Sequence, residues 1–238
     1  MKAPIPSNEA ERLAALQSYR ILDSAAEALY DDITQLAAYI CQVPIATISL
    51  VDEKRQWFKS RVGLSVQETP RDVAFCAHAI LQPQPLIVHD ATQDQRFADS
   101  TLVTQEPNIR FYAGFPLLNA AGFALGTLCA IDRQPRQITA EQINAMLSLA
   151  RQVMSLLEMR GVNDRLASAL EQLKTLRGLL PICAWCKRVR DDQGYWNRLE
   201  TYLQQHSEAD VTHSICPECF EREAKAAREE GPETEPAA

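Results

Sequence analysis

The residues with the most specific chemistry in this sequence are its seven cysteines, four of which form two C-x-x-C pairs. The pairs are Cys183 with Cys186 and Cys216 with Cys219. This spacing lets both thiolates of a pair bind one tetrahedral ion, and a set of four thiolates selects zinc. The sequence therefore predicts a structural zinc site with these four ligands, in a module too small to be stabilised by an apolar core alone.

The cysteines also allow other interpretations. His213, three residues before Cys216, is an alternative zinc ligand, and two buried thiol pairs without metal are an alternative to the site itself. A thiol redox enzyme or redox sensor that uses the C-x-x-C pairs is the functional alternative. The other three cysteines, Cys41, Cys76 and Cys129, stand alone in apolar segments, which predicts small buried side chains.

The amino-terminal part of the chain, which holds Cys41, Cys76 and Cys129, has the sequence pattern of a folded domain. Capping boxes at Asn8 with Glu11 and at Ser24 with Glu27, each followed by apolar residues at helical spacing, predict two helices. Asp72 is predicted to cap a short helix over residues 73–80. Apolar runs bounded by turn residues predict strands over 45–51, 55–62, 86–89, 109–118 and 123–132. Residues 1–138 are predicted to form an α+β domain, an antiparallel sheet with helices packed on one face.

The rest of the chain divides into three segments. A capping box of Thr139 and Gln142 and apolar residues at alternating spacings of 3 and 4 predict a long helix over 139–180, with a phase break near Gly161. Such a helix is about 60 Å long, so we predict that part of it forms a coiled coil in a homodimer. Residues 181–222 are predicted to form the cysteine-rich module, and 223–238 to be a frayed helix and disordered tail.

Charge and hydropathy exclude some classes of partner. Lys and Arg number 24 against 31 Asp and Glu, a net charge of -7. Scattered positive charge of this kind argues against nucleic-acid binding. No apolar run spans the roughly 20 residues that a bilayer requires, and the charged amino terminus does not have the apolar core of a signal peptide. We therefore predict a cytoplasmic protein without a membrane partner.

Four blocks in the amino-terminal part together resemble a GAF domain of the type attached to bacterial sensor kinases and diguanylate cyclases. They are residues 52–63, 75–80 and 88–97, and the pair 109–114 and 126–133. The resemblance implies a central antiparallel sheet, a cup for a small molecule on one side and dimerisation through terminal helices. Residues 181–196 with 212–219 resemble a cysteine-rich tail that follows PAS, GAF or receiver domains in bacterial signalling proteins.

The ligand of such a cup is not determined by the fold. Pockets combine aromatic walls with a few polar groups, which selects six candidate ligand-binding residues: Trp57, Phe75, His78, Phe97, Arg110 and Tyr112. The alternative is that these side chains pack the core and that the domain is purely structural. Arg110 is expected to bind an anionic ligand or to pair with Asp90 or Asp132.

The sequence has no P-loop, Gly-rich dinucleotide turn, kinase signature or Ser/His/Asp set that can be assigned to catalysis. We therefore predict that the protein is not an enzyme. The predicted function is cytoplasmic signalling, in which a GAF domain senses a small molecule or a redox state. The dimeric helix then passes a change in packing to a zinc-stabilised module that binds a partner protein.

Overall fold

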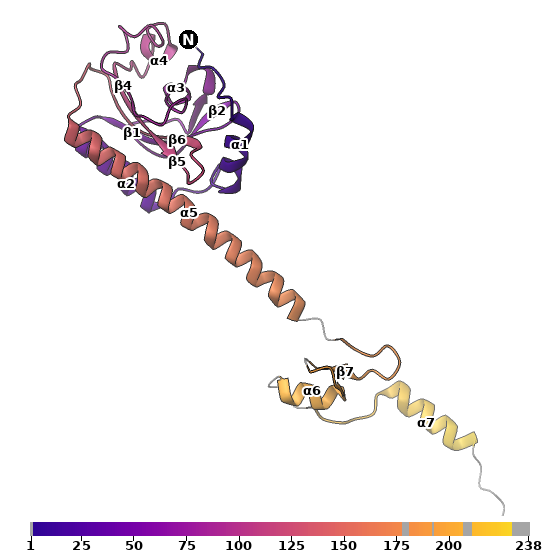
Figure 1. The fold of residues 1–238 in the computed structure, drawn as a ribbon. Helices are drawn as coiled ribbons and strands as arrows, with labels where there is room; N and C mark the ends of the chain where they lie inside the picture. Colours follow the sequence, from indigo (N-terminus) through magenta and orange to yellow (C-terminus); the bar gives the residue numbers. More distant parts are fainter. Residues whose placement is uncertain (1, 178–180, 192, 207–210, 230–238) are drawn as a thin grey trace, which may run out of the picture. The chain divides into compact units, whose positions relative to one another are not determined.

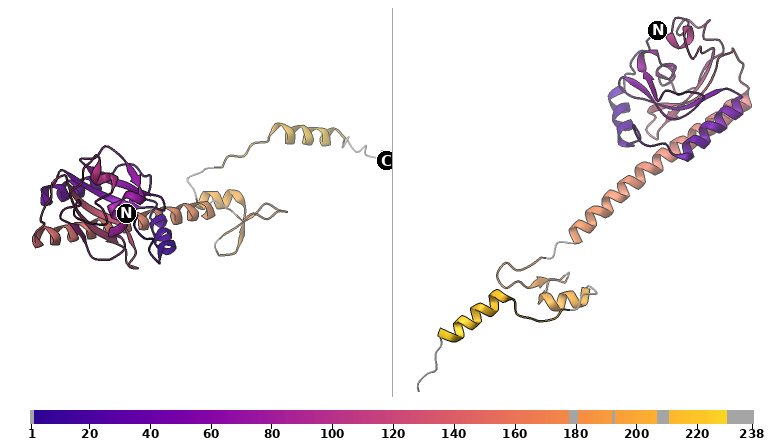
Figure 2. Two further views of the ribbon diagram at one scale, coloured as in Figure 1. Left: turned by 90° about the horizontal axis from the view of Figure 1, so that it is seen from above. Right: turned by 180° about the vertical axis from the view of Figure 1, so that it is seen from behind.

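The computed structural model describes residues 2–177, 181–191, 193–206 and 211–229 (Figures 1 and 2). The chain divides into two compact units, Met1–Ala169 and Leu170–Ala238. The first unit holds the sheet and the helices packed on it. The second holds the end of the long helix and the cysteine-rich segment.

The first unit is built on a six-stranded antiparallel sheet with the order β3-β2-β1-β6-β5-β4. The strands are β1 (Ile45–Val51), β2 (Arg55–Val62), β3 (Glu68–Pro70), β4 (Leu86–Val88), β5 (Phe111–Leu118) and β6 (Ala124–Asp132). The α+β class and the antiparallel GAF-like sheet are thereby confirmed. Sequence reasoning missed β3, because a strand of three residues that ends in proline has no readable alternation.

Both faces of this sheet are buried, and strand alternation separates their side chains. We call the side lined by Ala46, Ile48 and Leu50 of β1 the first face. The second face carries the intervening residues of β1, including Ile45 and Val51. A residue's position in its strand therefore decides which of the two cores it joins.

Helices α1 (Glu9–Ser18), α2 (Ala28–Cys41) and α5 (Ala140–Arg177) cover the first face (Figure 1). On α5, Met146, Val153 and Leu157 are buried in this core. The second face is covered by the 3-10 turn η1 (Arg71–Val73), the short helices α3 (Phe75–Ala79) and α4 (Thr101–Thr104), and loops. The thinner cover over the second face is made of short elements that depend on side-chain packing for their stability.

One of the three predicted capping boxes is confirmed. The Gln142 amide N–H donates to Thr139 Oγ1 at 3.3 Å, and the Thr139 N–H donates to Gln142 Oε1 at 3.0 Å. The boxes at Asn8 and Ser24 are wrong, since Asn8 makes no side-chain cap bond and α2 begins only after Glu27. Asp72 does not cap α3 either, because residues 71–73 form the separate turn η1.

The helix α5 continues without interruption through Gly161 and extends beyond the sheet. Residues 178–180 of the predicted helix lie outside the described residues. In the second unit, β7 (Val189–Arg190) pairs with β8 (Trp196–Asn197), followed by α6 (Leu199–His206) and α7 (Pro217–Glu229). Residues 223–229 are helical, within the segment over which the sequence predicted a frayed helix and a disordered tail. Among the described residues, no helix is long and apolar enough to cross a membrane.

Candidate sensory site

An aromatic cluster occupies the centre of the second face. The rings of Phe75 and Phe97 stack with centroids 4.0 Å apart, and Tyr112 lies 5.0 Å from Phe75. His78 meets the Phe97 ring edge-on at 4.8 Å. Four of the six predicted ligand residues, Phe75, His78, Phe97 and Tyr112, are therefore brought together. They fill the centre of the predicted cup with the chain's own side chains.

The other two predicted ligand residues lie elsewhere. Trp57 packs in the core of the first face, because the alternation of β2 turns it away from the aromatic cluster, so its assignment to the cup is corrected. Arg110 donates to the carbonyls of Val103 at 2.8 Å and Ile109 at 3.1 Å. Asp132, one of its expected partners, is paired with Arg136. Arg110 thus braces the loop before β5.

A compact group of sulfur and hydroxyl atoms lies against the aromatic cluster. The Sγ atoms of Cys76 on α3 and Cys129 on β6 are 3.4 Å apart. The Tyr112 hydroxyl lies 3.3 Å from the first sulfur and 3.5 Å from the second, and Thr127 Oγ1 lies 3.0 Å from Cys129 Sγ. The predicted burial of both cysteines is confirmed. Their contact was missed, because it follows only from packing α3 over β6.

The two thiols differ in acidity because their surroundings differ. Burial, with the neighbouring Cys129, raises the pKa of Cys76 well above the ordinary thiol value. Burial acts in the same direction on Cys129, but hydrogen bonds from Cys76, Thr127 and Tyr112 outweigh it and lower its pKa to about 7. Cys129 is therefore the sulfur whose anion the site favours.

A pocket of about 310 Å³ opens on the second face, and none of the residues that line it belongs to the sulfur and hydroxyl group. Apolar side chains of Leu102, Ile109 and Ile131 line it, together with Gln56 and Thr69. The last two are directly opposite each other on β2 and β3. Within the described part of the chain, the buried Gln56 Oε1 and Thr69 Oγ1 atoms have no hydrogen-bond partner. The pocket thus combines an apolar wall with polar side chains, which include Glu106 and Arg133 besides Gln56 and Thr69.

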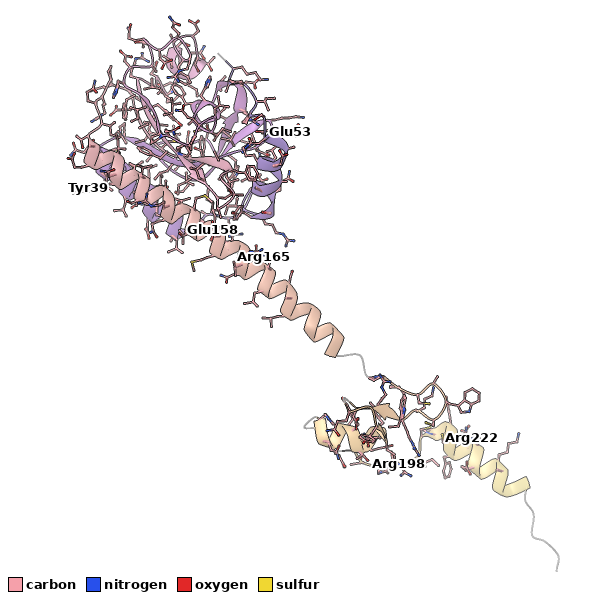
Figure 3. The ribbon with its side chains drawn as sticks, viewed as in Figure 1. Tyr39, Glu53, Glu158, Arg165, Arg198 and Arg222 are labelled. Carbon is pink, nitrogen blue, oxygen red and sulfur yellow. The ribbon has the colours of Figure 1, made fainter. Side chains whose placement is uncertain are left out.

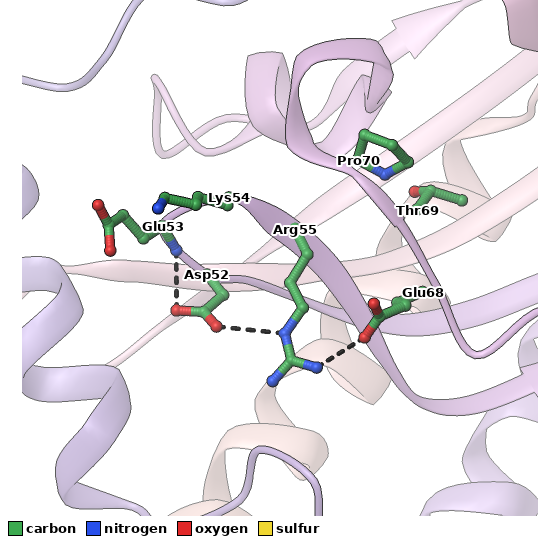
Figure 4. Close-up of a pocket in the computed structure, with 7 residues that line it drawn as sticks. All are labelled: Asp52, Glu53, Lys54, Arg55, Glu68, Thr69 and Pro70. Carbon is green, nitrogen blue, oxygen red and sulfur yellow. Dashed lines mark hydrogen bonds and ion pairs between the residues drawn. The ribbon is translucent and has the colours of Figure 1, made fainter.

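Another hollow lies at the turn between β1 and β2 (Figure 4). The guanidinium group of Arg55, which lines it, is already bound by carboxylates. Arg55 donates to Asp52 at 3.3 Å, to Glu68 at 2.6 Å and to Asp23 at 2.6 Å. These bonds raise the pKa of the guanidinium above its ordinary value, chiefly through Asp23 and then Glu68. The arrangement fastens β3 to the turn and leaves this arginine saturated with internal partners.

A chain of ionic contacts joins the sheet to α5. The buried Lys59 Nζ on β2 donates to Glu27 Oε1 at 2.6 Å, and Arg160 Nη1 on α5 donates to the same oxygen at 2.6 Å. Lys59 also binds Ser24 Oγ and the Ala25 carbonyl. Glu27 therefore connects a strand of the sheet to the helix at the point where α5 leaves the first face.

The tail cysteines lie in two different local structures: Cys183 and Cys186 bracket a turn, whereas Cys216 precedes α7 and Cys219 is in the first turn of that helix. The Cys186 N–H donates to Cys183 Sγ and the Cys219 N–H to Cys216 Sγ, both at 3.5 Å. These backbone hydrogen bonds lower the pKa of Cys183 and Cys216. Each C-x-x-C pair has the donor set of a zinc-binding pair. Among residues 181–191, 193–206 and 211–229, however, no three metal-binding side chains converge, so the four-cysteine site remains a prediction.

The antiparallel sheet buried on both faces, the aromatic cluster on its second face and the helix that leads away from it define an α+β domain. The family model of the GAF domain matches residues 25–157, more than half of the chain, and the chain belongs to this family. The resemblance noted in the sequence is thereby confirmed.

Known relatives extend this assignment. The chain is 46% identical over 153 residues to the cyclic di-GMP phosphodiesterase PA2567 of Pseudomonas aeruginosa; the match covers 64% of this chain and 26% of the relative. The blue-light absorbing form of the Thermosynechococcus elongatus PixJ GAF domain aligns with a TM-score of 0.51 and 14% identity, covering 68% of this chain and 96% of that one. At that identity, the second match shows the fold alone.

The comparison corrects one prediction and confirms another in its general form. The expectation that the protein is not an enzyme is contradicted, because the relative at 46% identity is named as a phosphodiesterase. That expectation relied on a search for catalytic motifs within this chain, which spans only about a quarter of the relative. The chain is a GAF-domain signalling protein, as predicted.

Proposed function

We propose that the chain acts in cyclic di-GMP signalling, as the sensory part that sets the activity of a phosphodiesterase. The observation that carries this proposal is the 46% identity to the phosphodiesterase of Pseudomonas aeruginosa, since the match covers the length of a GAF domain. Identity at this level supports a shared role for the matched segment.

We further propose that the signal enters at the pocket beside Gln56 and Thr69. The amide oxygen of Gln56 accepts hydrogen bonds, and the Thr69 hydroxyl can accept or donate. A small molecule with an apolar body and an N–H or O–H group would satisfy both atoms, and burying them without a partner is costly. Binding would therefore favour the conformation in which β2 and β3 enclose the ligand.

The long helix is the proposed output. Beyond the sheet, α5 carries the exposed apolar residues Met159, Val162 and Leu166 at spacings of 3 and 4. Figure 3 shows Arg165 on the same stretch of α5. A stripe of this kind supports pairing with a second copy of the chain as a coiled coil. Through Glu27, the sheet contacts Arg160 of α5 at the start of this stripe, so a change in the sheet can bias the packing of the pair.

The cysteine-rich segment is proposed to be a zinc-stabilised module that binds a partner protein. The N–H···S bonds in the two C-x-x-C pairs support this, because they prepare Cys183 and Cys216 as thiolates. Zinc bound by Cys183, Cys186, Cys216 and Cys219 would hold the two pairs together. A site of four zinc-bound thiolates would suit a reducing, cytoplasmic location, which we propose for the chain.

A chimera tests the proposed function. The GAF segment of the Pseudomonas aeruginosa relative is replaced by the first compact unit of this chain, Met1–Ala169, which includes both Glu27 and Arg160, and cyclic di-GMP hydrolysis is measured with and without Glu27→Gln. We expect the chimera to hydrolyse cyclic di-GMP and the substitution to change its rate, because it cuts the connection to α5. Identical rates in the chimera, the substituted chimera and the relative without its GAF segment would overturn the proposal.

Metal analysis separates the zinc module from the alternative of a dithiol redox sensor. We expect about one zinc per chain, and we expect its removal by a chelator to unfold the tail. A metal-free tail that cycles between thiols and disulfides would instead support the redox alternative.

A further inference from the structure

The cluster around Cys129 contains more polar side chains than the packing of a core requires. Thr47 and Ser49 on β1 are opposite Cys129 and Thr127 on β6, and all four side chains point to the second face. Thr47 Oγ1 lies 2.9 Å from Ser49 Oγ, which lies 4.0 Å from Cys129 Sγ. Alanine or valine would fill these positions without any polar atom to satisfy. The sheet thus surrounds one sulfur with hydroxyl groups in a buried site.

The backbone also makes room for the Tyr112 hydroxyl. Gly114 is opposite Cys129 in the sheet, two residues after Tyr112 on β5. A Cβ atom on Gly114 would lie 2.2 Å from the Tyr112 hydroxyl, so any larger residue would push this ring away from the sulfurs. The glycine permits the contact of Tyr112 with both thiols.

We propose that Cys76 and Cys129 form a redox site in which a hydroperoxide converts the two thiols to a disulfide. The Cys129 thiolate attacks the peroxide O–O bond and becomes a sulfenic acid, while the leaving oxygen takes a proton and departs as water or an alcohol. The Cys76 sulfur then attacks the sulfenic sulfur, forms the S–S bond and releases water. Two thiols and one hydroperoxide thus give one disulfide, one water and one water or alcohol.

The assignment of the attacking sulfur follows from the contacts. Thr127 can donate to Cys129, the Tyr112 hydroxyl donates to Cys76 and lies 3.5 Å from Cys129, and the two sulfurs are 3.4 Å apart, within reach for the second step. The two sulfurs belong to different elements, and α3 is a single short helix. Local opening of such an element costs less than global unfolding and would admit a small peroxide. The resulting bond would fix α3 to β6 and thereby change the cover of the second face.

This site is independent of the proposed ligand pocket and of the tail cysteines. Its control is Cys41, a buried thiol on α2 that packs in the first face, where burial raises its pKa to about 11. Cys41 shares the enclosure of the redox pair but not its hydroxyl groups or a second sulfur. Because the thiol form is the less reactive one, Cys41 should remain reduced.

The test treats the reduced full chain with hydrogen peroxide, blocks remaining thiols by alkylation after unfolding and maps the peptides by mass. We expect a disulfide between the peptides that hold Cys76 and Cys129, reversible by dithiothreitol and formed about tenfold faster than Cys41 is oxidised. Full alkylation of Cys76 and Cys129 after the tail cysteines have been oxidised would overturn the proposal.

Two variants test the role of the hydroxyl groups without changing either cysteine. Tyr112→Phe preserves the ring and Thr127→Val preserves the shape, and each removes a hydroxyl group that lies within 3.5 Å of Cys129 Sγ. We expect both to fold and to form the Cys76–Cys129 disulfide at least about threefold more slowly, since each lowers the thiolate fraction. An unchanged rate in both variants would contradict the proposed role of the hydroxyl groups.

Discussion

The two faces of the six-stranded sheet are both buried, yet they carry different chemistry. The first face meets three helices through an apolar core, and its ionic contacts lie at the rim, where Glu27 holds Lys59 and Arg160. The second face meets a short helix and loops, and it holds sulfur, hydroxyl and aromatic groups at its centre.

This difference indicates a division of roles. An apolar contact between long helices and a sheet transmits displacement, because close-packed cores have low compressibility. A thinly covered face with polar groups and a pocket can respond to a ligand or an oxidant. The strand β6 connects the two roles, because it carries Cys129 and is followed within eight residues by the start of α5.

The largest expected effect compares one aromatic residue from each face. Phe75→Ala on the second face and Phe111→Ala on the first should each lower the free energy of unfolding by about 3 to 5 kcal/mol, as both rings are buried. Chemical denaturation measures this loss. In the folded state, only Phe75→Ala should speed alkylation of Cys76, because its ring covers the second face next to that cysteine. Equal protection of Cys76 in both variants would remove the proposed distinction between the faces.

A smaller effect is expected at the rim of the first face. Glu27→Gln should cost about 2 kcal/mol of stability, because the fully buried amine of Lys59 loses its carboxylate partner. It should also increase hydrogen exchange in α5 around Arg160. The matched control is Glu53→Gln, an exposed carboxylate beside the pocket at the β1–β2 turn. A loss as small as that of the control would show that Glu27 does not fasten α5.

A third effect, seen only on acidification, is a dependence of stability on pH. Burial acts to raise the pKa of Glu9, but hydrogen bonds from Arg12 and Arg71 lower it to about 2. A carboxyl whose pKa is lowered on folding stabilises the fold above its unfolded value of about 4.3 and loses this contribution as pH falls toward 2. Denaturation between pH 5 and pH 2 should therefore show a steeper loss in the wild type than in Glu9→Gln. Parallel curves for the two proteins would contradict the lowered pKa of Glu9.

The sequence predicted those parts of the fold that local patterns encode. Strand alternation and the turn at residues 119–122 predicted β5 and β6, and the capping box at Thr139 predicted the start of α5. The sequence could not show that Trp57 faces away from the cup. Alternation separates the two sides of β2, but only the packed fold shows which side meets the long helices. The contact of Cys76 with Cys129 was beyond reach for the same reason, since 53 residues separate them and only the packed fold joins them.

Hydrogen–deuterium exchange of the full chain, compared between its reduced and peroxide-treated forms, tests the central claim that the second face responds and the first face transmits. The account predicts slower exchange in α3 and β6 after treatment, together with altered exchange in α5 near Arg160. If α3, β6 and α5 exchange identically in both forms while the tail alone changes, the second face is not the responsive part of the molecule.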